Sequence, residues 1–495
     1  MNDKLFERRS FLKKAATSAL AAPLLPSLNA LAADEPKKTA TTAKAKTVTV
    51  PAPPKAMLNV RDYGAKGDGT TKDTDALQQT IDRCSMLGGG EVIVPEGNYL
   101  TGAISLLSNV TLRLQDGAVL NGSPDVKTDY PLRQVRWEGH FMKAYIGFIN
   151  AIDAENIAIL GPGKIIATPA IKGRLERPSG MRLPPLIEFI NCKNVNVENL
   201  YTEQTGMWSI HPLYCENVTF KNVTVKSGAD GIDVDSCKHV VIDGCDFDTT
   251  DDCISLKSGR GIEGNTIGRP TEDVHISNCT FRDKVWACIG IGSETSGGIR
   301  NVHVYKCKCL GAGTFAIYIK SRPGRGAFIE DIYMNDLEVS GAALGFLRFN
   351  ILNSGIEDKP NLVPGNDGIP TIRNFHFSNI KVTDVPILVD GSSIHPNKPL
   401  EGFSLTNVTG TCGKIATGEK PRGFPEKVPA MISLAYINHA VLSGINVKVT
   451  DFKGPLLATL DVTGTGLTGA AKLTPADVAK VPDPILPPAT PYKLN

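Results

Sequence analysis

The sequence lacks both a long apolar segment and an excess of charge of either sign. After the N-terminal region, no stretch offers the roughly 20 uninterrupted apolar residues that a membrane-spanning helix needs. The chain has 53 Lys and Arg against 51 Asp and Glu, a net charge of +2. Nucleic-acid-binding proteins and proteins of anionic membrane surfaces carry a basic excess. The charge balance therefore gives no reason to expect either partner.

The first residues resemble an export signal. Arg8 and Arg9 precede an apolar run over 15–28, and the small-residue sequence Ala-Leu-Ala follows at 30–32. This order is typical of a twin-arginine signal peptide with a cleavage site, although an uncleaved N-terminal anchor would show the same pattern. We expect residues 1–32 to be a signal peptide. The mature protein would then be periplasmic or secreted, without stable membrane insertion.

Two further segments are expected to lie outside the folded body. Residues 33–56 are rich in Ala, Lys, Thr and Pro, a composition typical of a flexible linker. The Pro-rich segment 482–495 resembles a tail on the surface. Residues 57–481 are then left for a single domain.

From about residue 186 the sequence repeats a short β-branched strand that begins with Asn, Asp or His. Aligned on the first Val of each unit, the repeats have anchors at Val195, Val218, Val240, Val274 and Val302. The first two steps are 23 and 22 residues, and later steps are longer because loops such as 259–270 are inserted. Such a period, without helical pattern between the strands, is typical of a right-handed parallel β-helix. We therefore expect an all-β, single-domain solenoid.

The cysteines follow the same repeat. Three lie three residues before an anchor and three lie five residues after one: Cys192, Cys215, Cys237, Cys245, Cys279 and Cys307. Equivalent positions of successive coils stack about 4.8 Å apart, so we expect interior ladders of small apolar side chains rather than disulfides. His275 and His303 also share a register, but their polar neighbours favour a solvated pair over a metal site.

Residues 74–87 favour an amphipathic helix, with Leu77, Ile81, Cys84 and Leu87 on one face. Such a short capping helix would cover the N-terminal end of the β-helix, where strand edges would otherwise be exposed. The glycines at 88–90 follow a helix and precede a strand, the opposite order from a phosphate-binding loop. No nucleotide, other cofactor or metal is expected.

Three aspartates gather in two consecutive repeats. Asp230 and Asp252 each lie twelve residues after an anchor, so they occupy the same position in adjacent coils, and Asp251 precedes Asp252. Crowded carboxylates raise the pKa of at least one of them. Glycoside hydrolysis needs one protonated carboxyl to donate to the leaving oxygen and one ionised carboxylate to activate water. The alternative is turn chemistry, since Asp is common in loops.

The strands that follow the aspartates align further polar residues. The alignment predicts two columns across successive coils, one of Asp235, Lys257, Gly292 and Lys320 and one of Asp233, Ser255, Gly290 and Tyr318. Because charged side chains in these columns stand near the aspartates, their convergence favours a functional site over solvated turns.

Nearly the whole chain after residue 58 resembles glycoside hydrolase family 28, the polygalacturonase family. The similarity is carried, in order, by VRDYGAKGDG, DTDALQQTID, GGGEVIVPEGNYLTG, NVTLRLQDGAVLNGS, WSIHP, ADGIDVDSC, TTDDCISLKSG, IGSETSGGIRNV and IKSRPGRG. The resemblance implies an inverting hydrolase of pectin-type polysaccharide. It also implies that Asp251 is the general acid and that Asp230 and Asp252 hold the attacking water.

Three positions depart from the family pattern. Gly228 replaces the Asn of an Asn-Thr-Asp motif, the sequence Trp-Ala-Cys at 286–288 replaces Gly-His-Gly, and Tyr318 replaces the Arg of an Arg-x-Lys motif whose Lys is Lys320. Loss of that Arg should weaken recognition of the galacturonate carboxylate, because Lys offers a point charge without a planar fork. Specificity is then expected to move toward exo-acting cleavage, a decorated galacturonan or a rhamnogalacturonan.

The candidate substrate-binding residues follow from these departures. Arg322 and Arg325 are candidate replacements for the missing Arg, and Trp286 is either a stacking platform for a sugar ring or a buried aromatic at a coil corner. The remaining candidates are Lys320, Tyr318 and Lys257.

Two other functions stay open. A calcium-dependent pectate-lyase-like enzyme would share the architecture and use an Asp cluster, whereas a non-catalytic carbohydrate-binding β-helix would suit the lost His and Arg. In every case we expect a monomer whose partner is a polysaccharide or oligosaccharide.

Overall fold

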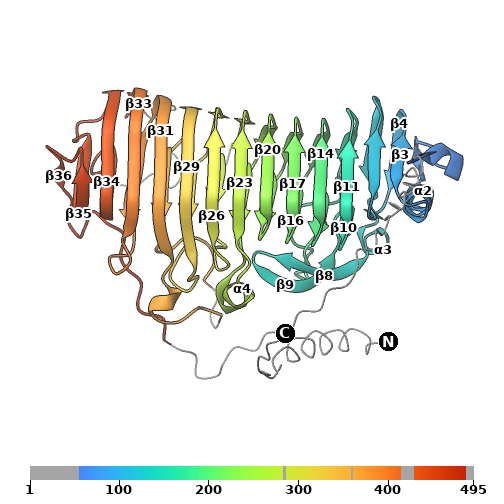
Figure 1. The fold of residues 1–495 in the computed structure, drawn as a ribbon, viewed down its shortest axis with the longest axis horizontal. Helices are drawn as coiled ribbons and strands as arrows, with labels where there is room; N and C mark the ends of the chain where they lie inside the picture. The colour runs from blue at the N-terminus through green and yellow to red at the C-terminus, as the bar shows by residue number, and fades with distance from the viewer. Residues whose placement is uncertain (1–54, 283–285, 358–360, 414–427, 487–495) are drawn as a thin grey trace, which may run out of the picture. The chain divides into compact units, whose positions relative to one another are not determined.

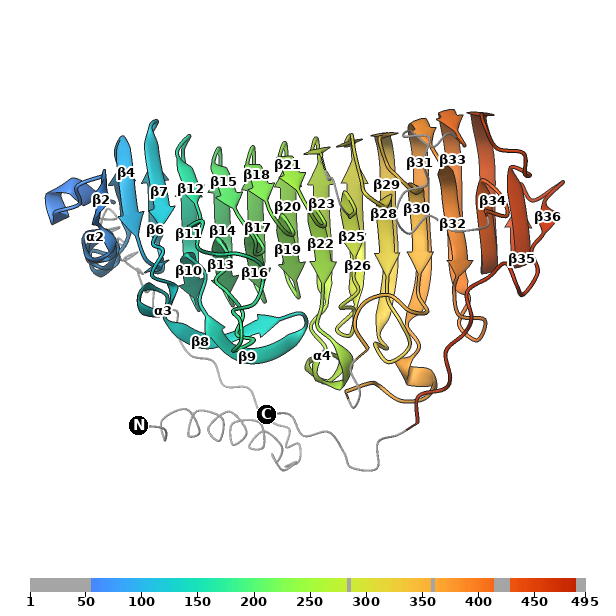
Figure 2. The same cartoon turned by 180° about the vertical axis from the view of Figure 1, so that it is seen from behind.

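The computed structural model describes residues 55–282, 286–357, 361–413 and 428–486. Their parallel strands form a right-handed β-helix, drawn as a row of arrows in Figure 1 and from behind in Figure 2. No helix in these ranges is long and apolar enough to cross a membrane. The predicted signal peptide and nearly all of the predicted linker lie outside the described residues, as does most of the predicted tail.

The first of three sheets carries the repeat anchors. It consists of β1 (Ala56–Asn59), β3 (Gly90–Val94), β6 (Val110–Leu114), β11 (Glu155–Leu160), β14 (Lys193–Glu198), β17 (Glu216–Lys221), β20 (Lys238–Asp243), β23 (Thr271–Ser277), β26 (Ile299–Tyr305), β29 (Phe328–Ser340), β31 (Thr371–Val385), β33 (Leu400–Cys412) and β34 (Ile432–Val449). All five predicted anchors are paired in register, from Val195 with Val218 to Val274 with Val302. The predicted repeat is confirmed residue by residue.

The second sheet lies beneath the candidate site. It runs through β5 (Ile104–Ser105), β10 (Ile149–Ile152), β13 (Ile187–Ile190), β16 (Ile210–Leu213), β19 (Ile232–Asp235), β22 (Ile254–Lys257), β25 (Ile289–Ile291), β28 (Phe315–Lys320), β30 (Gly345–Asn350), β32 (Ile387–Ser393), β34, β35 (Leu457–Thr465) and β36 (Ala471–Lys472). The predicted column from Asp233 through Ser255 and Gly290 to Tyr318 is paired throughout. In the other column, Asp235 pairs with Lys257.

The third sheet closes each coil. Its separate strands are β2 (Asp68–Lys72), β4 (Gly97–Thr101), β7 (Ala118–Gly122), β12 (Lys164–Ile166), β15 (Tyr201–Gln204), β18 (Thr224–Ser227), β21 (Asp246–Thr249), β24 (Thr280–Phe281) and β27 (Lys308–Cys309). Beyond β27 the later parts of the long strands β29, β31, β33 and β34 continue this sheet. Alternate side chains of all three sheets point inward and form one continuous apolar core.

A residue with a left-handed backbone precedes each anchor. Asn194 and Asn217 have φ of 54° and 57°, and His239 has 55°. Asn and Asp tolerate this conformation better than most residues, which explains why the repeats begin with these types. The Asn217 side-chain amide also donates to the Asn194 side-chain oxygen over 2.9 Å, and Asn194 donates to Asn156 over 2.8 Å. These bonds link the corners of neighbouring coils.

The cysteines are buried, and the six of the predicted ladders lie inside the coils. All 11 are buried free thiols, and the Sγ atoms of Cys192 and Cys215 lie 3.4 Å from the carbonyl oxygens of Ile190 and Leu213. The two histidines predicted to share a register do so, since His275 stacks on His303 with ring centroids 5.0 Å apart.

Helix α2 (Thr74–Met86) covers the N-terminal end of the coils, where it contacts β1, β3, β5 and β6. Leu77, Ile81 and Cys84 are fully buried, as the amphipathic pattern predicts. Leu87, expected on the same face, is instead the C-cap residue and is 45% exposed. The helix ends one residue earlier than the pattern, so Leu87 turns away from the core. The 3₁₀ turn η1 (Val60–Tyr63) lies beside α2.

Several insertions adjoin strands of the second sheet. Helix α3 (Val126–Asp129) and the antiparallel hairpin of β8 (Leu132–Trp137) and β9 (His140–Tyr145) precede β10, and a loop over 167–186 precedes β13. Helix α4 (Gly261–Ile267) follows β22, and η2 (Asn366–Gly368) lies between β30 and β31. The hairpin and α4 lie along one edge of the strand row (Figures 1 and 2). The start of the predicted tail also packs here, since Gly365 N–H donates to the Ile485 carbonyl over 2.8 Å.

Candidate active site

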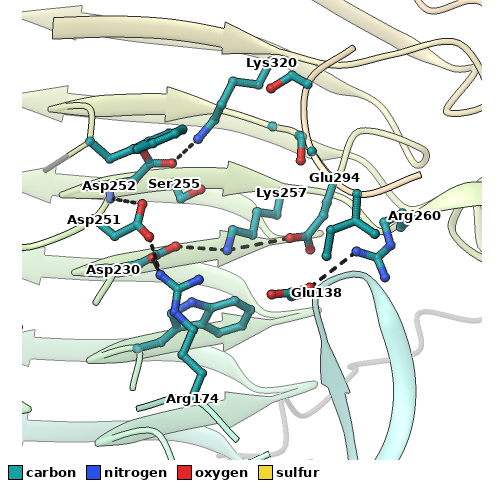
Figure 3. A pocket seen from close by; sticks show the side chains of 17 residues that line it. Glu138, Arg174, Asp230, Asp251, Asp252, Ser255, Lys257, Arg260, Glu294 and Lys320 are labelled. Atoms are coloured by element: carbon teal, nitrogen blue, oxygen red, sulfur yellow. Dashed lines mark hydrogen bonds and ion pairs between the residues drawn. The ribbon is translucent and has the colours of Figure 1, made fainter. Parts of the chain in front are cut away.

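A pocket of about 210 Å³ opens over strands β22 and β28, surrounded by the insertions. Its wall includes Glu138 from the hairpin turn, Arg174 from the 167–186 loop and Arg260 from the segment before α4. Figure 3 shows these side chains turned toward a floor of aspartates and lysines. The pocket thus combines residues on strands, whose positions are set by the register, with residues on loops, whose positions are not.

The three predicted aspartates meet in this pocket. Asp230 lies just before β19, and Asp251 and Asp252 lie just before β22. The Gly231 N–H donates to the Asp252 carbonyl over 2.9 Å, which sets Asp230 and Asp252 at equivalent points of adjacent coils. Asp230 and Asp252 are buried, whereas 29% of the Asp251 side chain is exposed. The arrangement expected from the repeat is therefore observed.

Two buried lysines neutralise part of the negative charge of the aspartates. The Lys257 ammonium lies 3.2 Å from Asp230 and 2.6 Å from Asp233, and 3.8 Å from Glu294. It also stands 3.8 Å above the ring centroid of Trp208, a cation–π contact. Lys320 pairs with Asp252. Both lysines predicted from the columns therefore contact the aspartates directly.

The pocket separates the pKa values of the three carboxyls. Burial raises the pKa of Asp252 to about 6 despite the opposing charge of Lys320. Burial and the charge of Asp230 also raise the pKa of Asp251, against Arg174 and Lys320. For Asp230, burial is outweighed by the charges of Lys257 and Arg174, so its pKa is lowered. One ionised carboxylate beside two more readily protonated ones is the combination that acid–base catalysis requires.

Sequence reasoning missed Arg174. Its Nη2 atom lies 3.3 Å from Asp230 Oδ1 and also contacts Asp251. Arg174 belongs to the loop inserted between β12 and β13, 77 residues from Asp251 in the chain. Because that loop has no counterpart in the other repeats, the period carries no information about it.

Glu138, Arg260 and Glu294 were also missed. Glu138 Oε2 lies 3.5 Å from Arg260 Nη1 across the pocket wall, and the Arg260 N–H donates to the Gly139 carbonyl over 3.3 Å. The hairpin tip therefore contacts the segment that leads into α4. The clustering of charged residues at 136–140 and 257–263 was the available signal, but nothing in the sequence pairs the two segments.

Residues 84–347, more than half of the chain, match the model of glycosyl hydrolases family 28. This range contains the three aspartates and both lysines. The chain belongs to glycosyl hydrolase family 28.

Relatives of this family 28 protein include a probable polygalacturonase of Vitis vinifera, 29% identical over 366 residues, which are 70% of this chain and 73% of the relative. An exo-poly-alpha-D-galacturonosidase of Dickeya chrysanthemi is 25% identical over 435 residues, 73% of this chain and 70% of the relative. Among solved structures, an exopolygalacturonase of Thermotoga maritima superposes with a TM-score of 0.65 at 28% identity, covering 73% of this chain and 88% of that chain.

Trp286 and Tyr318, two departures from the family 28 pattern, lie against each other. Their ring centroids are 6.4 Å apart and their planes differ by 24°. Trp286 lines the pocket and is 39% exposed, so it is not the buried corner aromatic of the alternative interpretation. Tyr318 is buried and its hydroxyl accepts a hydrogen bond from Asn350 over 3.3 Å. Tyr318 thus supports Trp286 from below.

Arg322 and Arg325, considered as replacements for the missing family 28 arginine, are directed elsewhere. Arg322 donates to the Gly355 carbonyl over 2.9 Å. Arg325 is fully buried and donates to the carbonyls of Ser293 and Ile356 over 3.0 and 2.6 Å. Gly355, Ser293 and Ile356 line the pocket, so the two arginines position its wall and do not themselves line it.

A buried chain of charges supports the pocket from the N-terminal side. Arg182 donates to Glu188 over 2.6 and 3.0 Å, and His211 lies 3.2 Å from Glu188 and 3.7 Å from Asp235. Arg136 of the hairpin completes the chain, 3.1 Å from Asp235. Burial raises the pKa of Glu188, but Arg182 and His211 outweigh it and lower that pKa to about 2. The network ties both the hairpin and the 167–186 loop to the coils.

Within the described ranges, no group of three or more His, Cys, Asp or Glu side chains has the arrangement of a metal site. The carboxylates of the pocket are instead matched by nitrogen cations, namely Lys257, Lys320 and Arg174.

Proposed function

We propose that this family 28 protein hydrolyses glycosidic bonds in galacturonate-containing, pectin-type polysaccharide and inverts the anomeric centre. The observation that carries the proposal is the pocket in which Asp230, Asp251 and Asp252 have divergent pKa values. The surrounding cations, Arg174, Lys257 and Lys320, suit an acidic sugar. The polygalacturonase names of the relatives support the same substrate class.

The environment of each aspartate suggests its catalytic role. Asp251 is the most exposed of the three and has a raised pKa, which suits a general acid that protonates the leaving oxygen. Asp230 stays ionised beside Lys257 and, with Asp252, holds the water that attacks the anomeric carbon from the opposite face.

We further propose exo-acting cleavage. The hairpin tip contacts the segment before α4 through Gly139 and Arg260, so a wall stands across one side of the pocket. The middle of a polysaccharide chain would collide with this wall, whereas the end of a chain fits against it. The relatives from Dickeya chrysanthemi and Thermotoga maritima carry exo-acting names.

The function is tested with residues 33–495 on polygalacturonate, its short oligomers and rhamnogalacturonan, following reducing ends and product stereochemistry by proton resonance. Single sugars with inverted configuration support the proposal and name the substrate. Calcium-dependent unsaturated products would identify a lyase instead, and binding without new reducing ends would identify a carbohydrate-binding protein.

Hydrolysis should be fastest in mildly acidic solution. Burial and the charge of Asp230 raise the pKa of Asp251, the proposed general acid, so its protonated form persists to higher pH than that of an ordinary aspartate. Since the protonated form of Asp251 is the active one, kcat/KM should fall as pH rises through its raised pKa, approaching about tenfold per pH unit. An initial-rate pH series on an oligogalacturonide checks this, and a rate that rises from pH 6 to 8 would contradict it.

Replacing Trp286 by Ala should raise KM roughly 3- to 10-fold with little change in kcat, because one aromatic stacking contact is lost. The exposed position of Trp286 above Tyr318 is the reason. Trp286→Phe serves as the matched control and should retain most of the affinity. An unchanged KM in the Ala variant, with a lowered melting temperature, would show that the ring serves only the fold.

We also propose that residues 1–32 direct export through the twin-arginine pathway, that 33–56 is a linker and that the enzyme acts as a monomer. Amino-terminal sequencing of the exported protein tests the cleavage site, and sedimentation tests the oligomeric state. A protein retained in the cytoplasm with an intact amino terminus would contradict export.

A further inference from the structure

We propose that Arg174 is a latch that couples recognition of an acidic sugar to protonation of the general acid: its guanidinium leaves Asp251 for the substrate carboxylate. The inference rests on the proposed function and deepens it, because it assigns the galacturonate-binding arginine and a way in which that residue controls the rate. Arg174 differs in its exposure and contacts from the other cations that line the pocket, Lys257, Lys320 and Arg260.

Arg174 is the most exposed of these cations. Its side chain is 35% exposed, compared with 6% for Lys257, 9% for Lys320 and 10% for Arg260. Lys257 is held by three carboxylates, and Lys320 is paired with Asp252. A guanidinium near the pocket surface can exchange partners at a smaller desolvation cost than a buried ammonium.

The contacts of Arg174 with the aspartates involve only one of its three guanidinium nitrogens. Both the Asp230 and the Asp251 contacts use the single nitrogen Nη2. Nε and Nη1 take part in neither contact, but each edge that binds a carboxylate through two parallel hydrogen bonds also uses Nη2, so Arg174 must leave the aspartates to bind a substrate carboxylate in this way. Bidentate binding of a galacturonate carboxylate therefore offers Arg174 a better partner than its present one.

The backbone that carries Arg174 is fixed, so only the side chain needs to move. The Leu183 N–H donates to the Arg174 carbonyl over 3.0 Å, and the Met181 carbonyl accepts from Glu176 over 2.8 Å. Arg182, in the same loop, is fully buried and bound to Glu188. A long side chain on a pinned loop can change partners by rotation about its own bonds.

Departure of Arg174 changes the chemistry of Asp251. The charged groups around Asp251 are Asp230, Arg174 and Lys320, together with the adjacent Asp252. Burial and Asp230 raise the pKa of Asp251, and the Arg174 charge and hydrogen bond lower it. When the guanidinium moves to the substrate, that pKa rises further and Asp251 takes up the proton that the leaving oxygen needs. A neutral sugar leaves Arg174 in place.

The proposed role of Arg174 also accounts for the altered Arg-x-Lys motif. Tyr318 stands where the family resemblance expects an arginine, and Arg322 and Arg325 bind backbone carbonyls of the pocket wall. Arg174 supplies a guanidinium to the same pocket from a different part of the chain. The carboxylate-binding fork is therefore relocated to a position where it also contacts the general acid.

The test compares the pH dependence of kcat and of kcat/KM on an oligogalacturonide. The first reports groups in the enzyme–substrate complex and the second reports the free enzyme. In the wild type, the alkaline limb of kcat should lie at higher pH than that of kcat/KM. In Arg174→Gln the two limbs should coincide, and KM should rise about 10- to 100-fold, the loss expected for a hydrogen bond to a charged group.

Two controls make the result specific. Arg177→Gln removes an exposed guanidinium from the same loop, outside the active-site pocket, and should leave both limbs and KM unchanged. Arg174→Lys keeps the charge without the fork, so it should retain part of the separation between limbs with a raised KM. Limbs that stay separated in Arg174→Gln would overturn the latch, as would limbs that coincide in an active wild type. A wild type that releases no reducing ends from any pectic substrate would contradict the proposed function itself, and the latch with it.

Discussion

Replacing Asp251 by Asn should reduce kcat about 10²- to 10⁴-fold, the contribution of a positioned general acid, while the folded protein stays as stable as the wild type or becomes slightly more stable. Asn preserves the shape of the side chain but cannot donate a proton to the leaving oxygen. Removing one carboxylate also relieves its repulsion with Asp230, whose charge raises the Asp251 pKa. Reducing-end assays together with thermal unfolding measure both effects.

The control for this variant is an aspartate of the same coil outside the pocket. Asp248 lies on β21, in the third sheet, and Asp248→Asn should leave kcat unchanged. An Asp251→Asn protein with wild-type turnover would reject the catalytic role. A large loss of stability in that variant would also count against it, because inactivity could then reflect unfolding.

Replacing Lys257 by Met should destabilise the protein by about 3–5 kcal/mol, the cost of leaving buried charge without its partner, and should also abolish most activity. Lys257 is the 2.6 Å partner of Asp233, which is fully buried, and it lies 3.2 Å from Asp230. Burial and the charge of Asp230 raise the pKa of Asp233 well above its usual range even with the lysine present. Denaturant unfolding gives the stability change directly.

A second substitution separates the loss of stability from the loss of activity. Asp233→Asn in the Lys257→Met background should restore much of the stability, because the fully buried unpaired carboxylate is gone. It should not restore activity, because Asp230 still lacks the cation that keeps it ionised. Lys238→Met, which breaks a 3.2 Å pair with Glu272 on the surface, is the matched control and should cost no more than about 1 kcal/mol. A double variant no more stable than Lys257→Met would show that the lysine acts through its other contacts.

The strand ladders explain why so much of the site could be predicted. In a parallel β-helix, a fixed count from an anchor is a fixed position in space, so Asp230 and Asp252 could be stacked by arithmetic alone. Their contact with Lys257 and Lys320 follows from the same ladders. A conserved family pattern was not needed for this step, only the period of the chain.

The rest of the site lies on insertions, where the period gives no position. Arg174 and Glu138 reach the pocket from segments that fold by packing on the coils, and their partners are distant in the chain. For the same reason the sequence proximity of Arg322 and Arg325 to Lys320 was misleading, since both turn toward the 353–357 segment. The local sequence pattern predicts a strand well, but the direction of a long side chain in a loop depends on contacts that no repeat encodes.

The pairing of Val240 with Val274 has a wider consequence. A whole helix, α4, is inserted between these two anchors, yet the register of β20 and β23 is the same as in the shorter steps. The strand stack can therefore be inherited unchanged while the segments around the pocket lengthen, shorten or are exchanged. A lineage of such proteins could acquire a new sugar preference through a single change in one inserted loop, while the coils that form the fold stay the same.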